Sequence, residues 1–113
     1  MTAFEEKYAV EYMPKAKEDL ARLDGAVRVR VVAGIEKASQ NPLPKAEGGY
    51  GKPLGNKQGR NLTNLLEVKF RGLGIRAVYK LVRVDKIMKI IVVSVRADEI
   101  VFKEALKRAQ QYI

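Results

Sequence analysis

Acidic and basic residues alternate with strand-forming residues on both sides of a Gly-Leu-Gly turn, in the segment EVKFRGLGIRAVYK at 67–80. Opposite residues of an antiparallel hairpin project from the same face of the sheet. A turn with an even number of residues places 71 opposite 76, 69 opposite 78 and 67 opposite 80, and it separates charged from apolar side chains. This register predicts one face that carries Glu67, Lys69, Arg71, Arg76 and Lys80.

A face of this kind has the groups needed to cleave RNA without a metal ion. Guanidinium groups fork onto phosphate oxygens and stabilise the extra negative charge of a pentacovalent transition state. The RNA 2′-hydroxyl supplies the nucleophile, so the protein must supply a base, cations on the phosphate and an acid. Glu67 is a candidate base, and Lys69 is a candidate base or acid. A solvated strand face explains the same alternation, and the pattern alone leaves both interpretations open.

The composition narrows the chemistry further. The chain has no cysteine and no histidine, which excludes thiolate and imidazole catalysis and the commonest metal ligands, so we expect neither a metal site nor a cofactor. Lysine and arginine number 22 against 13 acidic residues, a net charge of +9. Residues 67–113 hold 11 basic and 5 acidic side chains, against 11 and 8 in residues 1–66. The excess favours a polyanionic partner, either a nucleic acid or an acidic protein.

The N-terminal residues, MTAFEEKYAVEYMPK, lack the basic stub and apolar run of a signal peptide. The longest apolar run, 90–93, is far too short to cross a bilayer. We therefore expect a cytoplasmic protein without a membrane partner.

The elements that must position the charged residues follow from local periodicity and turn signals. Gly25 is expected to end the first helix, and Asp98 to cap the last one. The order β-αα-βββ-α predicts an α+β fold in a single domain, 1–113, whose antiparallel sheet packs one apolar face on an αα-hairpin and leaves one basic face. The expected elements are a strand at 7–13, helices at 14–24, 26–40 and from 98 onward, a long loop at 41–60, and strands at Leu65–Arg71, Ile75–Val84 and Met88–Arg96.

The expected loop at 41–60 carries basic residues and one tyrosine among glycines. Lys52, Lys57 and Arg60 are candidate RNA-binding residues, because long loops within compact domains are often functional. Tyr50 either stacks on a base or anchors the loop on the core, and we favour the anchor.

The last two strands bring a further arginine toward the hairpin. If their turn spans 85–87, Arg96 lies opposite Arg76. Directly opposed like charges repel, and an anion between them removes the repulsion. A two-residue turn would send Arg96 to the other face unless a bulge redirects it.

Three segments resemble the RelE/ParE superfamily of bacterial type II toxins: the N-terminal KYAVEYMPKAKEDLARLDGAVRVRVVAGIEKASQNP, then KFRGLGIRAVYKLV, and IIVVSVRADEIVFKEALKR. The loop GGYGKPLGNK is similar to that of a RelE-like branch found in bacteria and phage. The resemblance implies a fold of the order given above, and for the RelE-like branch it implies cleavage of mRNA in the ribosomal A site. Such toxins are neutralised by a small antitoxin protein, for which a surface of +9 suits an acidic partner.

The resemblance also implies roles for individual residues. Lys69, Arg76 and Arg96 stand where RelE-like enzymes carry a catalytic lysine and arginines, and Arg71 stands at an RNA-contacting position. Glu67 departs from the lysine that is usual there, although some relatives use a glutamate base. Phe102 replaces a tyrosine that acts on the reactive RNA group; it could stack on RNA or belong to the core, but it cannot exchange a proton.

Two other functions stay open at this stage. ParE-like members inhibit DNA gyrase by binding and need no nuclease residues, whereas a convergent set of Lys69, Arg76 and Arg96 favours the nuclease. A catalytically silent member that only binds its antitoxin is the third possibility, because Phe102 lacks the hydroxyl of the family tyrosine.

Overall fold

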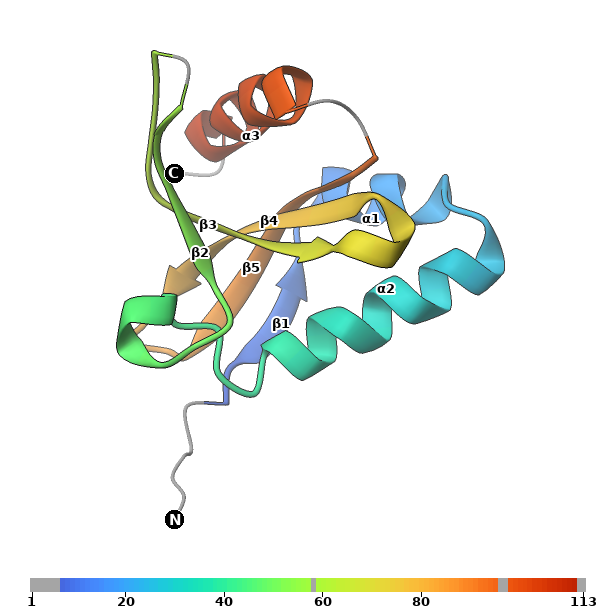
Figure 1. The fold of residues 1–113 in the computed structure, drawn as a ribbon, viewed down its shortest axis with the longest axis horizontal. Helices are drawn as coiled ribbons and strands as arrows, with labels where there is room; N and C mark the ends of the chain where they lie inside the picture. The colour runs from blue at the N-terminus through green and yellow to red at the C-terminus, as the bar shows by residue number, and fades with distance from the viewer. Residues whose placement is uncertain (1–6, 58, 96–97, 112–113) are drawn as a thin grey trace.

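The computed structural model describes residues 7–57, 59–95 and 98–111, which form one five-stranded sheet with helices on both faces (Figure 1). The strand order is β1-β5-β4-β3-β2, with β1 parallel to β5 and the other pairs antiparallel. This arrangement confirms the predicted α+β class. The elements are β1 Ala9–Tyr12, α1 Pro14–Ala21, α2 Gly25–Ala38, β2 Lys52–Lys57, β3 Arg60–Phe70, β4 Ile75–Val82, β5 Ile87–Ser94 and α3 Asp98–Gln111, with short 3₁₀ turns at Lys45–Glu47 and Arg71–Leu73.

The helices α1 and α2 form the expected hairpin, but their boundary differs from the prediction. Gly25 begins α2 rather than ending α1, because Asp24 caps α2 by accepting a hydrogen bond from the backbone N–H of Ala26 at 3.3 Å. In the sequence Val27, Val31, Ile35 and Ala38 recur at helical spacing, which predicts an apolar stripe on α2; the stripe is confirmed, since Val31 and Ile35 are fully buried. Among the described residues, no helix combines the length and the apolar character needed to cross a membrane.

The segment expected to be a loop at 41–60 contains an additional strand, β2, so that prediction was wrong. Glycine and proline are unusual in a strand, but β2 is the edge strand of the sheet and can accommodate them. Pro53 is tolerated because an edge strand forms ladder hydrogen bonds on one side only. Gly55, with φ +60°, lies at an irregularity in the pairing with β3. Leu54 fixes the strand by burying its side chain. As a result β3 begins at Arg60, five residues before the expected start.

The β3–β4 register differs from the prediction by two residues. Lys69 lies opposite Arg76, Glu67 opposite Val78, and Leu65 opposite Lys80. The difference arises because Arg71 belongs to the 3₁₀ turn that follows β3, and the chain reverses with a positive φ of 65° at Gly74. A shift of two preserves which residues share a face, so Glu67, Lys69 and Arg76 remain together.

Of the two alternatives for the β4–β5 turn, the one at 85–87 is wrong, because Arg76 lies opposite Ser94 rather than Arg96. The pairing shifts by one residue between Val78 and Tyr79, which leaves Ile91 as the extra residue of a bulge in β5. Ile91 and Val92 consequently both belong to the apolar cluster under α3. Arg96 itself lies outside the described residues.

The core has two layers, and this corrects the expectation of one apolar and one basic face. Helices α1 and α2 cover one face of the sheet, and α3 covers most of the other (Figure 1). An amphipathic helix must bury its apolar stripe, and in α3 that stripe contains Val101, Phe102 and Ala105. Glu67, Lys69 and Arg76, the charged side chains next to the β3–β4 turn, therefore lie at one margin of the second layer.

Candidate active site

Glu67, Lys69 and Arg76 form a cluster at the margin of the layer beneath α3. Strand alternation places Glu67 and Lys69 on the same face of β3, and antiparallel pairing places Arg76 directly opposite Lys69. Oε1 of Glu67 lies 3.5 Å from NH1 of Arg76, and Oε2 lies 3.8 Å from Nζ of Lys69. The side chains of Glu67, Arg76 and Lys69 are 2%, 16% and 30% exposed. A buried carboxylate is thus covered by two cations that reach solvent.

The contacts within this cluster are ion pairs rather than short hydrogen bonds. Oε1 of Glu67 is buried and accepts no hydrogen bond from the described part of the chain. A buried oxygen without a donor is costly, and a catalytic role is one of the reasons for which native structures retain such groups. Movement of the two flexible cations onto a ligand would expose this carboxylate as a proton acceptor.

Phe102 connects α3 to the cluster. Its ring centre lies 5.5 Å from Cζ of Arg76, within the range of a cation–π contact, and its side chain is buried in the core layer under α3. Phe102 is therefore a core residue, as one of the two interpretations held, and its ring lies against Arg76; stacking on RNA stays a prediction. The ring can orient the guanidinium but offers no proton.

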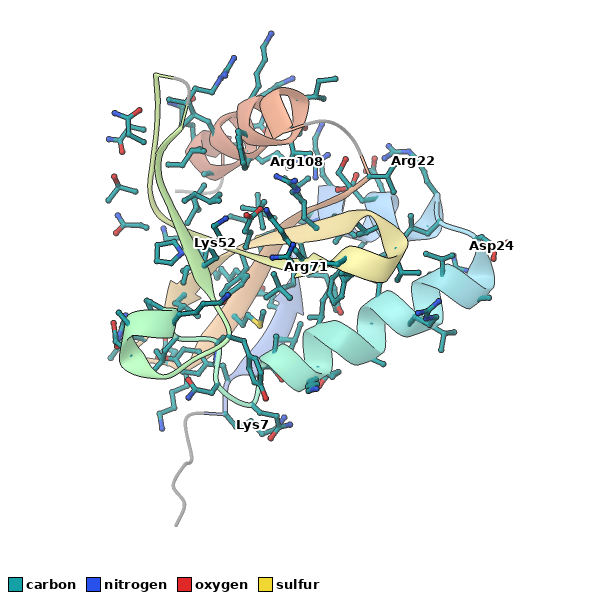
Figure 2. All side chains as sticks on the ribbon, viewed as in Figure 1. Lys7, Arg22, Asp24, Lys52, Arg71 and Arg108 are labelled. Carbon is teal, nitrogen blue, oxygen red and sulfur yellow. The ribbon has the colours of Figure 1, made fainter. Side chains whose placement is uncertain are left out.

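Lys52 and Arg71, two of the predicted RNA-binding residues, lie beside the cluster. Lys52 is paired with Glu67 across β2 and β3, and Arg71 begins the turn after β3. Both are exposed (Figure 2). Together with Lys69 they line a groove next to β3. The structure therefore brings five of the ten predicted site residues to one margin of the sheet and places Phe102 beside them.

Other predicted site residues lie elsewhere. Lys80 is opposite Leu65 and Lys89, beside the second half of α3, and is separated from Arg76 by about 13 Å of strand. Arg60 pairs with Lys57 at the far end of the β2–β3 hairpin, about 23 Å of strand from Glu67. Lys80, Arg60 and Lys57 therefore lie outside the cluster of Glu67, Lys69 and Arg76.

A second ionic cluster, which the sequence analysis missed, joins α1, β5 and α3. NH1 of Arg108 donates to Asp19 Oδ2 at 2.7 Å and to the carbonyl of Ile91 at 2.8 Å, and its Nε donates to Glu104 at 2.6 Å. Burial acts to lower the pKa of Arg108, but the hydrogen bonds and charges of Asp19 and Glu104 outweigh it and raise the pKa. The two main partners are 89 residues apart, so no local pattern signals the contact.

The loop before β2 is anchored by a different tyrosine from the one expected. Tyr50 is 47% exposed, so the prediction that it anchors the loop was wrong. Tyr79 of β4 does so instead, by donating its hydroxyl to the carbonyl of Pro42 at 2.7 Å, and burial raises its pKa. Alternation along β4 could have indicated an inward Tyr79, but not its partner.

Comparison with known proteins identifies the fold. No protein-family model and no curated protein sequence matches the chain. The RelBE2 toxin–antitoxin complex of Mycobacterium tuberculosis is similar with 26% identity over 81% of this chain and 94% of that chain, at a TM-score of 0.64. A double mutant of the Escherichia coli toxin RelE in the free state is similar with 24% identity over 90% and 97%, at a TM-score of 0.66. The intact Escherichia coli RelBE toxin–antitoxin complex matches at 20% identity over 80% and 98%, with a TM-score of 0.59. The chain therefore has the fold of RelE-like type II toxins, as its sequence predicted.

Proposed function

We propose that this protein is the toxin of a type II toxin–antitoxin pair and that it cleaves ribosome-bound mRNA without a metal ion. The carrying observation is the buried carboxylate of Glu67 between the cations of Lys69 and Arg76. The similarity to RelE and to RelBE complexes supports the class of toxin and a cognate antitoxin partner. The net charge of +9 supports a polyanionic substrate.

The proposed reaction is attack of the RNA 2′-oxygen on the adjacent phosphorus. Arg76 and Lys69 move from the carboxylate onto the phosphate oxygens and neutralise the charge that develops there. Glu67, uncovered by that movement, accepts the 2′-hydroxyl proton, and the ammonium of Lys69 donates a proton to the departing 5′-oxygen. The products are a 2′,3′-cyclic phosphate and a 5′-hydroxyl.

Phe102 has a positioning role in this proposal. Its ring holds the guanidinium of Arg76 on the side of the cluster that faces α3. A tyrosine would add a group that exchanges protons, and acid–base groups contribute about 10²–10⁴-fold to rates. We therefore expect slow but measurable cleavage. Arg96, the remaining catalytic residue that the resemblance implies, is included in the proposal on sequence grounds alone.

The test is a reconstituted translation reaction containing ribosomes stalled with an open A site on a defined message. Primer extension should detect cleavage by the native protein, and Arg76→Ala should reduce its rate by at least about 10²-fold, as loss of one transition-state donor typically does. The matched control is Arg30→Ala, which removes an exposed arginine from the middle of α2 and should cleave normally.

Two results would contradict the proposal. Intact message at saturating protein, together with a block of DNA supercoiling by gyrase, would assign the protein to the ParE-like mode. Intact message with gyrase unaffected would leave a catalytically silent protein that binds its antitoxin.

A further inference from the structure

A groove of about 430 Å³ lies between the second half of α2, the loop before β2 and the last residues of β3. Five cations line it: Lys37, Lys45, Lys52, Lys69 and Arg71. Among the described residues that line it, the one acidic side chain is Glu67, whose charge is already paired with Lys69 and Arg76. The groove is therefore strongly electropositive and suits a polyanion.

The floor of the groove is apolar and includes a ring. Phe70 packs so closely on α2 that a Cβ at Gly34 would lie 2.3 Å from Cε1 of the ring, so glycine at that helical position is required by the contact. Glycine within a helix is destabilising relative to alanine, and the packing of Phe70 offsets that cost. The half-buried ring thus leaves one surface toward the groove.

Tyr50 provides an exposed aromatic ring at the side of the same groove. Its backbone is held in place: the N–H of Tyr50 donates to the carbonyl of Asn41 at 2.9 Å, and the N–H of Gly51 donates to Leu43 at 3.0 Å. Behind it, the hydroxyl of Tyr79 occupies the space that a Cβ at Gly51 would need, at 2.3 Å. An exposed ring on a fixed backbone requires little ordering when it binds a flat partner.

The groove is continuous with the proposed active site. The pairing of β2 with β3 ends at Lys52 and Glu67, so the edge of β3 from Val68 to Phe70 lies open to the groove. Lys69 and Glu67 belong to both the groove and the catalytic cluster. A chain that passes the cluster can therefore continue directly into the groove.

We infer that this groove binds a nucleotide of single-stranded RNA adjacent to the linkage that is cut. Lys37, Lys45 and Arg71 contact the phosphates, and the base lies against Tyr50 over the apolar floor. Cations along a groove combined with an aromatic platform are the general means of holding single strands without reading their sequence. The inference rests on the proposed function for its position next to the scissile linkage, but its binding chemistry can be tested apart from cleavage.

The binding test uses fluorescence anisotropy with a labelled ten-nucleotide RNA that is 2′-O-methylated throughout and cannot be cleaved. Tyr50→Ala should weaken binding about 5- to 100-fold, because stacking contributes that much per base, whereas Tyr50→Phe should bind like the native protein. Both variants change an exposed side chain, so circular dichroism should show an unchanged fold.

The lysines are tested through salt dependence. The double variant Lys37→Ala/Lys45→Ala should lower the slope of log affinity against log salt by about 1.4, since each phosphate contact on a single strand contributes about 0.7. The matched control is Lys17→Ala/Lys103→Ala, which removes two exposed lysines from α1 and α3, away from the groove. Equal effects in the two double variants, or an unchanged affinity of Tyr50→Ala, would overturn the inference.

The binding assay and the cleavage assay distinguish failure of the groove inference from failure of the proposed function. Groove-dependent RNA binding by a protein that leaves ribosome-bound message intact would remove the proposed function and keep the groove as an RNA site. If Tyr50→Ala changes neither the cleavage rate nor the RNA affinity, the proposed function would be kept and the groove would be removed as an RNA site.

Discussion

The described residues contain two clusters of buried charge, and they are built in opposite ways. In the first, Asp19 and Arg108 approach to 2.7 Å and hydrogen-bond to each other and to the backbone. In the second, Glu67 lies 3.5 Å from Arg76 and 3.8 Å from Lys69, and one of its oxygens accepts no hydrogen bond from the described residues. The first cluster is complete within the protein, whereas the second leaves capacity for a ligand.

The Asp19–Arg108 pair satisfies backbone groups of β5 that lie beyond the end of β1. Strand β1 pairs with β5 only as far as Ile90, so the next backbone groups along that edge have no neighbouring strand. Asp19 accepts the N–H of Val93 at 3.0 Å, and Arg108 donates to the carbonyl of Ile91 at 2.8 Å. The ion pair thus takes the place of a longer β1 and fastens α1 and α3 to the sheet (Figure 2).

The largest expected effect is on catalysis by the open cluster. Glu67→Gln preserves shape but removes the proposed base, so cleavage of ribosome-bound mRNA should fall by about 10²–10⁴-fold. The free energy of unfolding should fall by less than about 3–5 kcal/mol, the cost of breaking a fully buried pair, because the side chains of Lys69 and Arg76 are 30% and 16% exposed. Primer extension and urea denaturation measure the two quantities. A large loss of stability with normal cleavage would make Glu67 a structural residue.

The complete cluster should show the opposite pattern. Arg108→Met removes the buried cation from Asp19 and Glu104, while Asp19 keeps the exposed Arg22 at 3.0 Å; breaking a buried pair costs about 3–5 kcal/mol. Urea denaturation should show this loss, and the protein that remains folded should cleave at close to the native rate. Arg30→Met, at an exposed arginine, is the matched control. A loss below about 1 kcal/mol would mean that water replaces Arg108 easily and that the two clusters do not differ as described.

The smallest expected effect concerns Phe102, through which α3 reaches the open cluster. Phe102→Tyr adds a hydroxyl to a ring that lies 5.5 Å from Arg76. It should raise the cleavage rate by less than about 10²–10⁴-fold, the contribution of a well-placed acid–base group, because the ring is buried in the core layer under α3. Single-turnover cleavage on stalled ribosomes measures this, with Phe102→Leu as a control that retains bulk but lacks both ring and hydroxyl. An unchanged or lower rate in Phe102→Tyr would show that proton transfer here does not use this position.

The sequence by itself determined the local features of the protein. The spacing of Val31 and Ile35 predicted the buried side of α2, and alternation around the turn after β3 predicted that Glu67, Lys69 and Arg76 share a face. The absence of cysteine and histidine limited the available catalytic groups. These inferences succeeded because side-chain periodicity is set by the backbone geometry of each element alone.

Only the tertiary structure decided the strand register and the contacts between those elements. The pairing of Arg76 with Lys69 and Ser94 depends on the 3₁₀ turn and on the bulge at Ile91, and strand β2 contributes Leu54 to the apolar cluster under α3. Asp19 and Arg108 lie 89 residues apart, and nothing near either of them indicates the other. Register and long-range contacts come from the simultaneous packing of distant apolar surfaces, which a local pattern in the sequence does not encode.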